Sequence, residues 1–452
     1  MGSLSSNTRL DDWIGRSDAA SSVPLDLEAL DLGDEVQITG AGSVLAPALA
    51  GGLVPVGPGP SFQASLQADI FTGTALADVL AGNLGDDMLL GAEGDDTLRG
   101  GVGDDVLNGG DGNDLVQGGQ GDDEVLGGAG DDTLFGHDGD DTLLGQDGDD
   151  EITAGRGNDR IEGGAGDDQI DAGRDADTVF GGGGDDILFG GGAQDQLFGD
   201  AGNDRIGGGG SRDYIDGGAG DDTIFGNRGA DTLSGGAGDD LISGGSGRDT
   251  IDGGLGDDSL RGRQDADVIN GADGDDEIFG GGGDDILQGG FGNDIITGGG
   301  GDDIFFGDNG IDAFLFDSTH TGTDTVVDFE AGERILLRNF TFEDAAEARQ
   351  AFTQTGTDVV FSSGDVTVVF EGAILPFVVT GVELVDTSID AEPTSFDFTG
   401  IQGLAPAPVL PGEMFEEAVE ASRFTADAPA VEDILDFGID LLGDTFDFTD
   451  FA

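Results

Sequence analysis

The chain has 452 residues, with 95 acidic residues against 16 basic ones, 90 glycines, no cysteine and a formal net charge of -79. The lack of cysteine excludes disulfides, thiolate metal sites and cysteine nucleophiles. All 16 basic residues are arginine, so no lysine can form a Schiff base or complete a P-loop. Nucleic acids and anionic membranes would be repelled, and no apolar run is long enough to span a membrane. This composition favours cations as partners.

Residues 1–72 form an N-terminal flank that we predict to be partly disordered. The flank has a polar start, an Ala/Gly/Pro-rich stretch over residues 40–60 and a lead-in to the next region. Its first thirty residues lack the basic start and apolar stretch of a signal peptide. It is also too short and too poor in core-type residues for a catalytic domain. We therefore expect neither a cleaved leader nor an enzyme in this region.

From residue 73 to residue 315 the chain divides into 27 nonapeptides without an insertion or deletion. The sixth position of every unit is Asp, the eighth is always apolar, and the fourth is Gly in 22 units. A single apolar centre per unit predicts a three-residue strand after a six-residue Gly-rich loop. One such strand buries nothing alone, so the units must stack. Two units per turn would give two facing parallel sheets, with strands about 4.8 Å apart and a thin aliphatic core.

The loops have the chemistry of a calcium site. Ca²⁺ takes six to eight oxygen ligands from carboxylates and backbone carbonyls. The glycines allow a tightly curled backbone, and the sixth-position Asp adds a carboxylate. Over residues 73–315 there are 58 acidic residues and ten arginines, so repulsion would keep the metal-free chain unfolded and calcium binding would drive folding. A disordered acidic buffer is the alternative, but it would need no constant spacing.

The units GGAGDDTLF (127–135) and GGAGDDTIF (217–225) fit the pattern GGxGxDxUx. This pattern resembles the calcium-binding repeats of the RTX (repeats-in-toxin) proteins of Gram-negative bacteria. The resemblance implies an all-β, right-handed parallel β-roll of two sheets with 18 residues per turn and calcium held between loops. It also implies export by a type I system that reads an uncleaved C-terminal signal. Residues 322–340 and 358–385 resemble the segments that follow and cap such a roll.

The sixth-position aspartates are the predicted calcium ligands, for roughly 18 to 25 ions in total. Nineteen are predicted as full ligands: Asp87, Asp96, Asp105, Asp114, Asp123, Asp132, Asp141, Asp150, Asp159, Asp168, Asp186, Asp204, Asp222, Asp240, Asp258, Asp276, Asp285, Asp294 and Asp303. Eight are predicted as weaker ligands: Asp78, Asp177, Asp195, Asp213, Asp231, Asp249, Asp267 and Asp312.

Reading alternate units separately distinguishes two edges of the coil. In odd-numbered units the fifth position is Asp or Asn from Asp95 to Asn293, whereas in even-numbered units it becomes Ala, Gln or Arg between residues 176 and 266. Four units in that stretch also lose the fourth-position glycine, to Asp175, Ala193, Ser211 and Asp265. Because a side chain there would strain a backbone with positive φ, we expect roughly seven even-edge sites between Asp159 and Asp285 to be weak or empty.

Five arginines fall on this stretch: Arg174, Arg212, Arg228, Arg248 and Arg263. Two interpretations stay open. Arginine could replace the missing calcium charge locally, or the five could form a surface for a partner, such as a carboxylate-bearing glycan. Substitution by glutamine separates them, because the first predicts lost calcium-dependent folding and the second predicts lost binding with folding intact.

The region after the repeats divides into three parts. Residues 316–385 are predicted to form a capping β region, and residues 386–412 read as a Pro-containing linker. Residues 413–452 have helical spacing followed by an acidic and aromatic end. This last segment resembles a type I secretion signal.

The repeats explain the spacing of the many paired carboxylates without an acid–base role, and no HExxH, GxSxG or P-loop motif occurs. We predict a non-enzymatic, secreted calcium-binding protein of a Gram-negative bacterium, extracellular or cell-surface associated, with a structural or adhesive role. The alternative is a secreted effector or carrier that acts through a bound partner. The expected partners are calcium, the type I secretion machinery and either a surface polysaccharide or another protein, but not nucleic acid.

Overall fold

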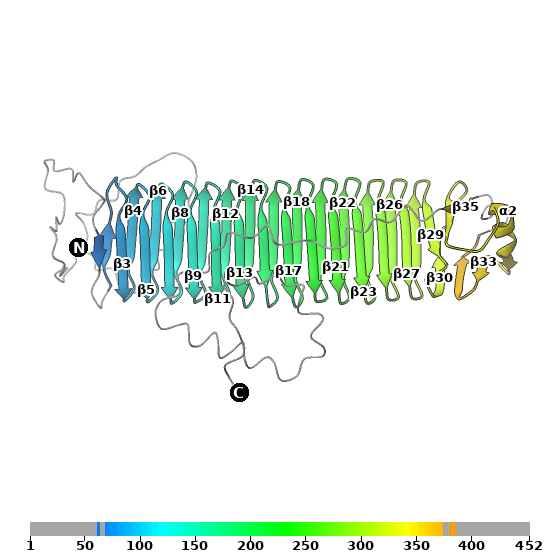
Figure 1. Ribbon diagram of the computed structural model, residues 1–452, viewed down its shortest axis with the longest axis horizontal. Helices are drawn as coiled ribbons and strands as arrows, with labels where there is room; N and C mark the ends of the chain where they lie inside the picture. Colours follow the sequence, from blue (N-terminus) through cyan, green and yellow to red (C-terminus); the bar gives the residue numbers. More distant parts are fainter. Residues whose placement is uncertain (1–60, 64–67, 374–377, 379–380, 386–452) are drawn as a thin grey trace, which may run out of the picture. The chain divides into compact units, whose positions relative to one another are not determined.

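The computed structural model describes residues 61–63, 68–373, 378 and 381–385. Most of the predicted N-terminal flank, the predicted linker and the predicted secretion signal lie outside the described residues. The described chain coils into a parallel β-roll whose strands stack in sequence order along its axis (Figure 1). No helix in this part of the chain is long and apolar enough to cross a membrane.

The strands alternate between two sheets. Sheet A consists of β1 (Ser61–Gln63), β3 (Val79–Leu84), β5 (Thr97–Val102), β7 (Leu115–Gln120), β9 (Thr133–Asp138), β11 (Glu151–Arg156), β13 (Gln169–Arg174), β15 (Ile187–Gly191), β17 (Arg205–Gly210), β19 (Thr223–Arg228), β21 (Leu241–Ser246), β23 (Ser259–Gln264), β25 (Glu277–Gly282), β27 (Ile295–Gly300), β29 (Ala313–Asp317), β31 (Arg334–Arg338) and β35 (Val382–Val385). Sheet B consists of β2 (Ile70–Thr72), β4 (Met88–Glu93), β6 (Val106–Asp111), β8 (Glu124–Ala129), β10 (Thr142–Asp147), β12 (Arg160–Ala165), β14 (Thr178–Gly183), β16 (Gln196–Ala201), β18 (Tyr214–Ala219), β20 (Thr232–Ala237), β22 (Thr250–Leu255), β24 (Val268–Asp273), β26 (Ile286–Phe291), β28 (Ile304–Asn309), β30 (Gly322–Val326), β34 (Val366–Phe370), β33 (Asp358–Ser363) and β32 (Phe352–Thr355).

Neighbouring strands pair in parallel with an offset of 18 residues, as Leu80 with Leu98 in sheet A and Leu143 with Ile161 in sheet B. The all-β fold of two parallel sheets with two nonapeptides per turn is therefore confirmed. The stack also extends beyond the repeats, because β1 pairs with β3 and β31 pairs with β29.

The predicted three-residue strands were too short. Most strands have six residues, formed by positions seven to nine of one unit and one to three of the next, so the turn between sheets is only three residues long. The reason is that parallel pairing continues through the glycine-rich positions, as Asn83 with Gly101 and Leu84 with Val102. Sequence alternation missed this extension because glycine carries no side chain to mark a face.

The core is one side chain thick. Every eighth-position residue from Leu80 to Phe314 is at most 3% exposed, and together they form a single hydrophobic cluster between the sheets. The first position of each unit also faces inward, it is always Gly or Ala, and it is buried in every unit except the first. Two inward positions per strand, one large and one minimal, therefore set the thickness of the core.

An aromatic cluster closes the C-terminal end of this core. The rings of Phe305 and Phe314 lie 6.1 Å apart edge to face, and Phe316 contacts both Phe305 and Phe370. The antiparallel strands β32 to β34, with α2 (Ala345–Ala348) and η2 (Arg349–Ala351), cover this end of the roll. Phenylalanine replaces the aliphatic residues where the two-sheet core ends, so the last turn is not left open to water.

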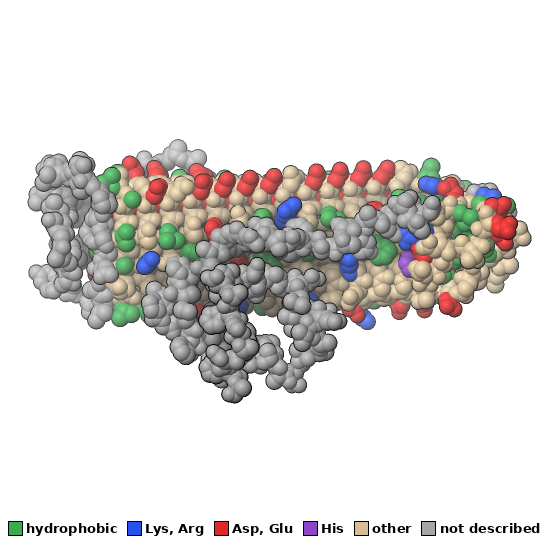
Figure 2. Space-filling view, viewed as in Figure 1, with side chains coloured by type: hydrophobic (Ala, Val, Ile, Leu, Met, Phe, Trp, Pro, Cys, Tyr) green, Lys and Arg blue, Asp and Glu red, His purple; other side chains and the backbone are tan. Residues whose placement is uncertain are grey.

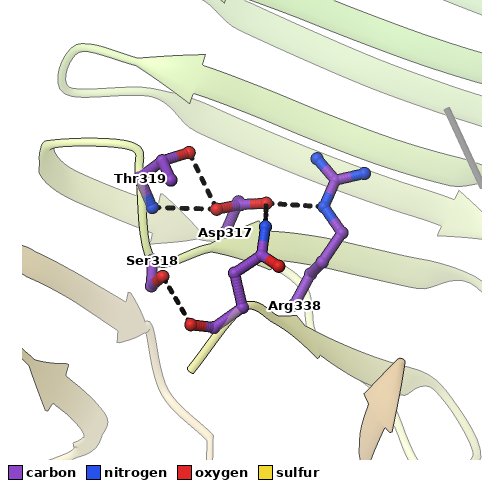
Figure 3. Close-up of polar contacts among 5 residues, drawn as sticks. Asp317, Ser318, Thr319 and Arg338 are labelled. Atoms are coloured by element: carbon purple, nitrogen blue, oxygen red, sulfur yellow. Dashed lines mark hydrogen bonds and ion pairs between the residues drawn. The ribbon is translucent and has the colours of Figure 1, made fainter. Parts of the chain in front are cut away.

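A buried ion pair holds the chain where the repeats end (Figure 3). The Oδ2 atom of Asp317 accepts hydrogen bonds from Arg338 Nε at 2.5 Å and from Asn339 Nδ2 at 2.8 Å. Its Oδ1 atom accepts from the backbone N–H and the hydroxyl of Thr319. Burial opposes ionisation, but the Thr319 and Arg338 contacts outweigh it and hold the pKa of Asp317 below 3.8. This contribution to stability is present above pH 4 and is lost only in stronger acid.

Candidate calcium sites

All 27 sixth-position aspartates lie at the end of a three-residue turn between the two sheets. Each is at most 3% exposed. Those of odd-numbered units line one edge of the roll and those of even-numbered units line the other. The acidic side chains that Figure 2 shows along one edge are exposed ones, because the sixth-position aspartates lie buried beneath the surface. The structure therefore brings all the predicted full and weaker ligands into two rows, one on each edge.

Within each row, one carboxylate oxygen is used by the protein itself. The backbone N–H of Asp222 donates to Oδ1 of Asp240, 18 residues later, at 2.7 Å, and Asp231 donates to Asp249 in the same way at 2.9 Å on the other edge. The Asp222 carbonyl in turn accepts from the N–H of Leu241 at 2.8 Å. These bonds tie each turn to the next and fix the orientation of every carboxylate.

The second carboxylate oxygen has no partner. In 26 of the 27 sixth-position aspartates the Oδ2 atom is buried without a hydrogen bond, and in Asp78 the unpartnered atom is Oδ1. A buried oxygen of an ionised carboxylate costs several kcal/mol when nothing compensates it. One orphaned oxygen per nonapeptide is far above what folded proteins ordinarily contain, so the roll requires a positive group at these points.

The orphaned oxygen lies close against the first-position glycine, where there is no room for a side chain. A β-carbon on Gly217 would lie 2.3 Å from Asp222 Oδ2 and 2.6 Å from the carbonyl oxygen of Gly235 in the next turn. A carboxylate oxygen and a backbone carbonyl oxygen thus border the same small space. Nowhere in the described residues do three carboxylate or imidazole side chains converge. Carboxylate and backbone carbonyl oxygens are ligands that calcium takes.

Burial raises the pKa of these carboxyl groups. It raises that of Asp222 to about 7 and that of Asp186 to about 8, against a hydrogen bond from the preceding turn and with further increases from neighbouring carboxylates. The same causes act on both edges, as at Asp231 and Asp267. Near neutral pH these rows cannot be fully ionised without a counter-charge, which a divalent cation supplies.

A second, exposed ladder runs along the fifth positions in the opposite direction. On the odd edge the backbone N–H of Asp239 donates to Asp221 Oδ1 at 2.9 Å, and such bonds continue from Asp95 to Ile311. On the even edge the described hydrogen bonds stop at Ala176 and resume only between Asp302 and Asp284. The break coincides with the degenerate stretch of the even edge, by which we mean the stretch whose calcium sites are predicted to be weak or empty.

The fourth position shows how the even edge accommodates its substitutions. Asp175, Ser211 and Asp265 adopt φ values of 74°, 107° and 74°, whereas Ala193 does not have a positive φ. A left-handed conformation costs a residue with a side chain roughly 1–2 kcal/mol. The sixth-position ladder nevertheless continues through this stretch, as from Asp213 to Asp231 at 2.8 Å. The strain predicted from the sequence is therefore present at three positions, and whether these sites hold calcium stays a prediction.

The first position adds a steric difference on the same edge. Ala154 and Ala172 replace glycine there, and both are fully buried. Their methyl groups lie where other units have only a glycine against the orphaned oxygen, here that of Asp159 or Asp177. Sequence reading had placed Asp159 among the full ligands without considering this methyl group.

Three acidic residues beyond the repeats contact or continue the last turns and were missed, and of these Asp324 extends a row of sixth-position aspartates by a hydrogen bond. Asp324 Oδ1 accepts from the N–H of Asp303 at 3.3 Å, and burial raises its pKa to about 7. Asp328 accepts from the N–H groups of Gly307 and Asp308, and burial raises the pKa of Glu333 to about 8. The offset from Asp303 to Asp324 is 21 residues rather than 18, so a strict nonapeptide template ends too early. A search that allowed a three-residue insertion would have found Asp324.

The structure places the five predicted surface arginines on one sheet and one edge. Arg174, Arg228 and Arg263 lie on the sheet A strands β13, β19 and β23, while Arg212 and Arg248 lie in even-edge turns, which directly follow sheet A strands. Arg212 slightly lowers the pKa of Asp231, although burial dominates there and raises it.

These features define a parallel β-roll whose edges are built to hold cations. The RTX calcium-binding nonapeptide repeat family matches the chain in 11 overlapping windows that together run from residue 72 to residue 313. The match covers more than half of the 452 residues, so the chain belongs to the family of RTX calcium-binding nonapeptide repeat proteins. The resemblance stated from the sequence is confirmed, and the repeats are calcium-binding repeats.

Two solved structures show limited similarity. The extracellular lipase LipA from Serratia marcescens matches at 19% identity with a TM-score of 0.21, over 48% of this chain and 41% of the lipase. A hyperactive, Ca²⁺-dependent, β-helical antifreeze protein from an Antarctic bacterium matches at 21% identity with a TM-score of 0.23, over 66% of this chain and 94% of that protein. The aligned region thus spans less than half of the lipase. No curated protein matches the chain.

Proposed function

We propose that this protein is a secreted calcium-binding β-roll that folds on calcium outside the cell and has a structural or adhesive role at the cell surface or in the matrix. The observation that carries the proposal is the row of buried, unpartnered carboxylate oxygens on each edge. Such rows are costly in a metal-free roll and are compensated when a divalent cation is bound. The metal therefore acts as part of the fold rather than as a catalyst.

The residues that would hold the cation come from adjacent turns of one edge. Asp222 and its equivalents offer the orphaned oxygen, and the backbone carbonyl of the next first position offers another. When bound, calcium supplies positive charge and accepts oxygen ligands. The hydrogen bond from the preceding turn already fixes the carboxylate, so little side-chain entropy is lost on binding. We propose roughly 18 ions if the even edge is degenerate and about 25 if every pair of turns holds one.

Export fits the same physical chemistry. Calcium-dependent modules outside cells bind with dissociation constants of about 0.1–1 mM, well above cytosolic calcium. A chain with 58 acidic residues in its repeats would stay unfolded at low calcium and could pass through a type I system before folding. Residues 413–452 are the proposed secretion signal. The family membership of the repeats supports this proposal.

A fractionation experiment tests secretion and surface role together. The full chain and a chain ending at residue 412 would be expressed in a Gram-negative host that carries a type I system. We expect the full chain on the cell surface or in the medium, released from the surface by a calcium chelator, and the shorter chain inside the cell. Secretion of the shorter chain, or surface attachment that survives chelation, would contradict the proposal.

The second candidate is an effector or carrier that acts through a bound partner. The observation that favours it is the set of exposed arginines on sheet A, which stands out in a chain of net charge -79. Incubation of the calcium-loaded chain with surface polysaccharide separates the two roles. Binding to polysaccharide supports adhesion, whereas capture of one specific protein together with no binding to polysaccharide supports the carrier role.

A further inference from the structure

The outer faces of the two sheets carry opposite charge. Over the strands of the repeats, sheet A holds seven arginines and four acidic residues, whereas sheet B holds one arginine and ten acidic residues. The one arginine of sheet B, Arg160, is paired with Glu162 on the same strand. Figure 2 shows single arginines spread over the viewed face and acidic side chains along an edge. Sheet A is thus a basic face on a strongly acidic protein.

The basic face of sheet A also carries aromatic side chains. Phe189, Phe225 and Phe279 occupy the same outward row, on β15, β19 and β25, and each is half-buried. Gly192, which directly follows β15, and Gly210, the last residue of β17, have no atom within 4 Å of the position of a β-carbon. Arginines and phenylalanines around a floor of small residues suit a ligand that presents both carboxylates and aromatic rings.

The chain itself contains a segment of that composition. Residues 386–452 hold 16 acidic residues, one arginine and eight phenylalanines, in runs such as TFDFTDF. They follow β35, the last described strand, which belongs to sheet A. A 67-residue segment reaches about 220 Å when extended, whereas β5, the most distant sheet A strand with an arginine, lies 14 strand positions from β35, or about 67 Å away. The segment can therefore reach every arginine of the sheet A face.

We propose that the outer face of sheet A is a docking surface for the acidic, aromatic segment 386–452 of the same chain. Charge complementarity favours sheet A over sheet B as the docking surface, because the acidic face of sheet B would repel the segment. Tethering favours the chain's own segment over a free ligand, because a linked segment acts at an effective concentration of about millimolar. A free polyanion or the acidic sheet B of a second copy has no such advantage. Docking requires the folded roll, so it follows calcium binding, and it does not depend on the proposed route of export.

The lack of cysteine allows a direct test by disulfide trapping. Thr445→Cys in the segment is combined with Ser246→Cys on β21 of sheet A, beside Arg228, or with Ser234→Cys on β20 of sheet B. Both serines are half-buried strand residues, so they form a matched pair. Each double variant of the full chain is oxidised at low protein concentration with saturating calcium. Intramolecular disulfide is then followed by gel mobility, with circular dichroism as the check on folding.

We expect the sheet A pair to form the disulfide at least several-fold faster than the sheet B pair. Replacing Arg174, Arg228 and Arg261 by glutamine in the sheet A pair should remove most of that difference while the β content stays the same, and 1 M salt should act similarly because it screens exposed charges. Equal rates on the two faces, or a rate unaffected by the arginine substitutions, would overturn the proposal.

Two further results would assign the face to another occupant. Disulfide-linked dimers in place of intramolecular bonds would assign it to a second copy. Binding of polygalacturonate to the full chain as tightly as to a chain ending at residue 385 would assign it to an external polyanion. Under the proposal, the shorter chain binds the polyanion more tightly, because the face is then uncovered. Either of the first two outcomes contradicts docking of the segment.

Discussion

At the scale of single residues, the two oxygens of each sixth-position Asp have different roles. Oδ1 joins successive turns through the backbone N–H of the preceding turn, and in all but Asp78 the buried Oδ2 has no hydrogen-bond partner and is the oxygen that we propose binds calcium. The same residue therefore serves both the stacking of the roll and the binding of metal. This division explains why the sixth position is Asp in every unit, including units whose fourth and fifth positions have changed. Asn could make the hydrogen bond but would bring no charge.

Substitution of one aspartate on each edge tests the difference between the edges. Asp222→Asn should lower the number of bound calcium ions by roughly one or two, because the residue lies between two neighbouring turns. It should also destabilise the calcium-bound roll by about 1–3 kcal/mol. Asp231→Asn, the matched change on the degenerate edge, should leave the ion count unchanged. Isothermal titration calorimetry gives both numbers, and equal losses at both positions would contradict the degeneracy of the even edge.

The raised pKa values predict how pH acts on the metal-free chain. Burial raises the pKa of Asp222 to about 7 and that of Asp186 to about 8, above their unfolded value near 3.8. The folded state therefore binds these protons more tightly, and their contribution to stability is complete below about pH 4 and is lost as pH rises through 7 to 8. In chelator, β content measured by circular dichroism should increase as pH falls from 8 to 5. A circular dichroism signal that does not change over this range would contradict the raised pKa values of these carboxyl groups.

Calcium should show the opposite dependence on pH. Protons compete with the cation for the same carboxylates, so the calcium concentration at the midpoint of folding should rise as pH falls below about 7. The Asp317–Arg338 ion pair does not contribute to this pH dependence, because its stabilisation persists down to about pH 4. A midpoint that does not change with pH would show that the sixth-position carboxylates are not the ligands.

The need for glycine at the fourth position can be tested by comparison with a glycine whose site has room for a side chain. Gly220 has φ +136°, and a β-carbon there would lie 1.9 Å from the carbonyl oxygen of Gly202, so Gly220→Ala should cost about 2 kcal/mol or more. Gly183 has no atom within 4 Å of that position, so Gly183→Ala should be neutral or slightly stabilising. Thermal unfolding in saturating calcium measures both. Similar melting temperatures for the two variants would show that the turn tolerates a side chain.

At the scale of the strand, stability depends on one buried side chain per nonapeptide. Ile224 on β19 is fully buried between the sheets, whereas its neighbour Thr223 faces outward. Ile224→Ala should destabilise the roll by about 2–5 kcal/mol, because a core one side chain thick cannot collapse around a cavity. Thr223→Ala should change stability by less than about 1 kcal/mol. Urea unfolding with calcium present compares the variants, and a loss below 1 kcal/mol for Ile224→Ala would contradict the account of the core.

The sequence was sufficient to predict the pairing offset, the two sheets and the two rows of sixth-position aspartates, because the sixth and eighth positions repeat without interruption. It was not sufficient to predict strand length, since glycine at the first three positions gives no sign of which face it occupies. Asp324 and Glu333 were missed because the chain after Leu315 leaves the nonapeptide spacing while it continues the same sheets. The ion pair of Asp317 and Arg338 joins residues 21 positions apart and follows no repeat at all.

At the scale of the whole molecule, folding depends on the neutralisation of negative charge. The repeats carry 58 acidic residues against ten arginines, and the roll places 27 sixth-position carboxyl groups in two buried rows. Nearest-neighbour contacts dominate such a stack, so each ion that binds between two turns stabilises the next pair as well. Calcium would cancel most of the negative charge of the repeats, and only then would the basic face of sheet A act on the acidic C-terminal segment.

The measurement that tests this account most directly is a calcium titration of the purified chain, followed by circular dichroism, with magnesium as control and with bound ions counted by calorimetry. We predict a cooperative transition from coil to β structure near millimolar calcium, no transition with magnesium, and roughly 18 bound ions. A count near 25 would keep the roll but remove the degeneracy of the even edge. A chain already folded in chelator at neutral pH would contradict the claim that calcium binding is the source of its folding energy.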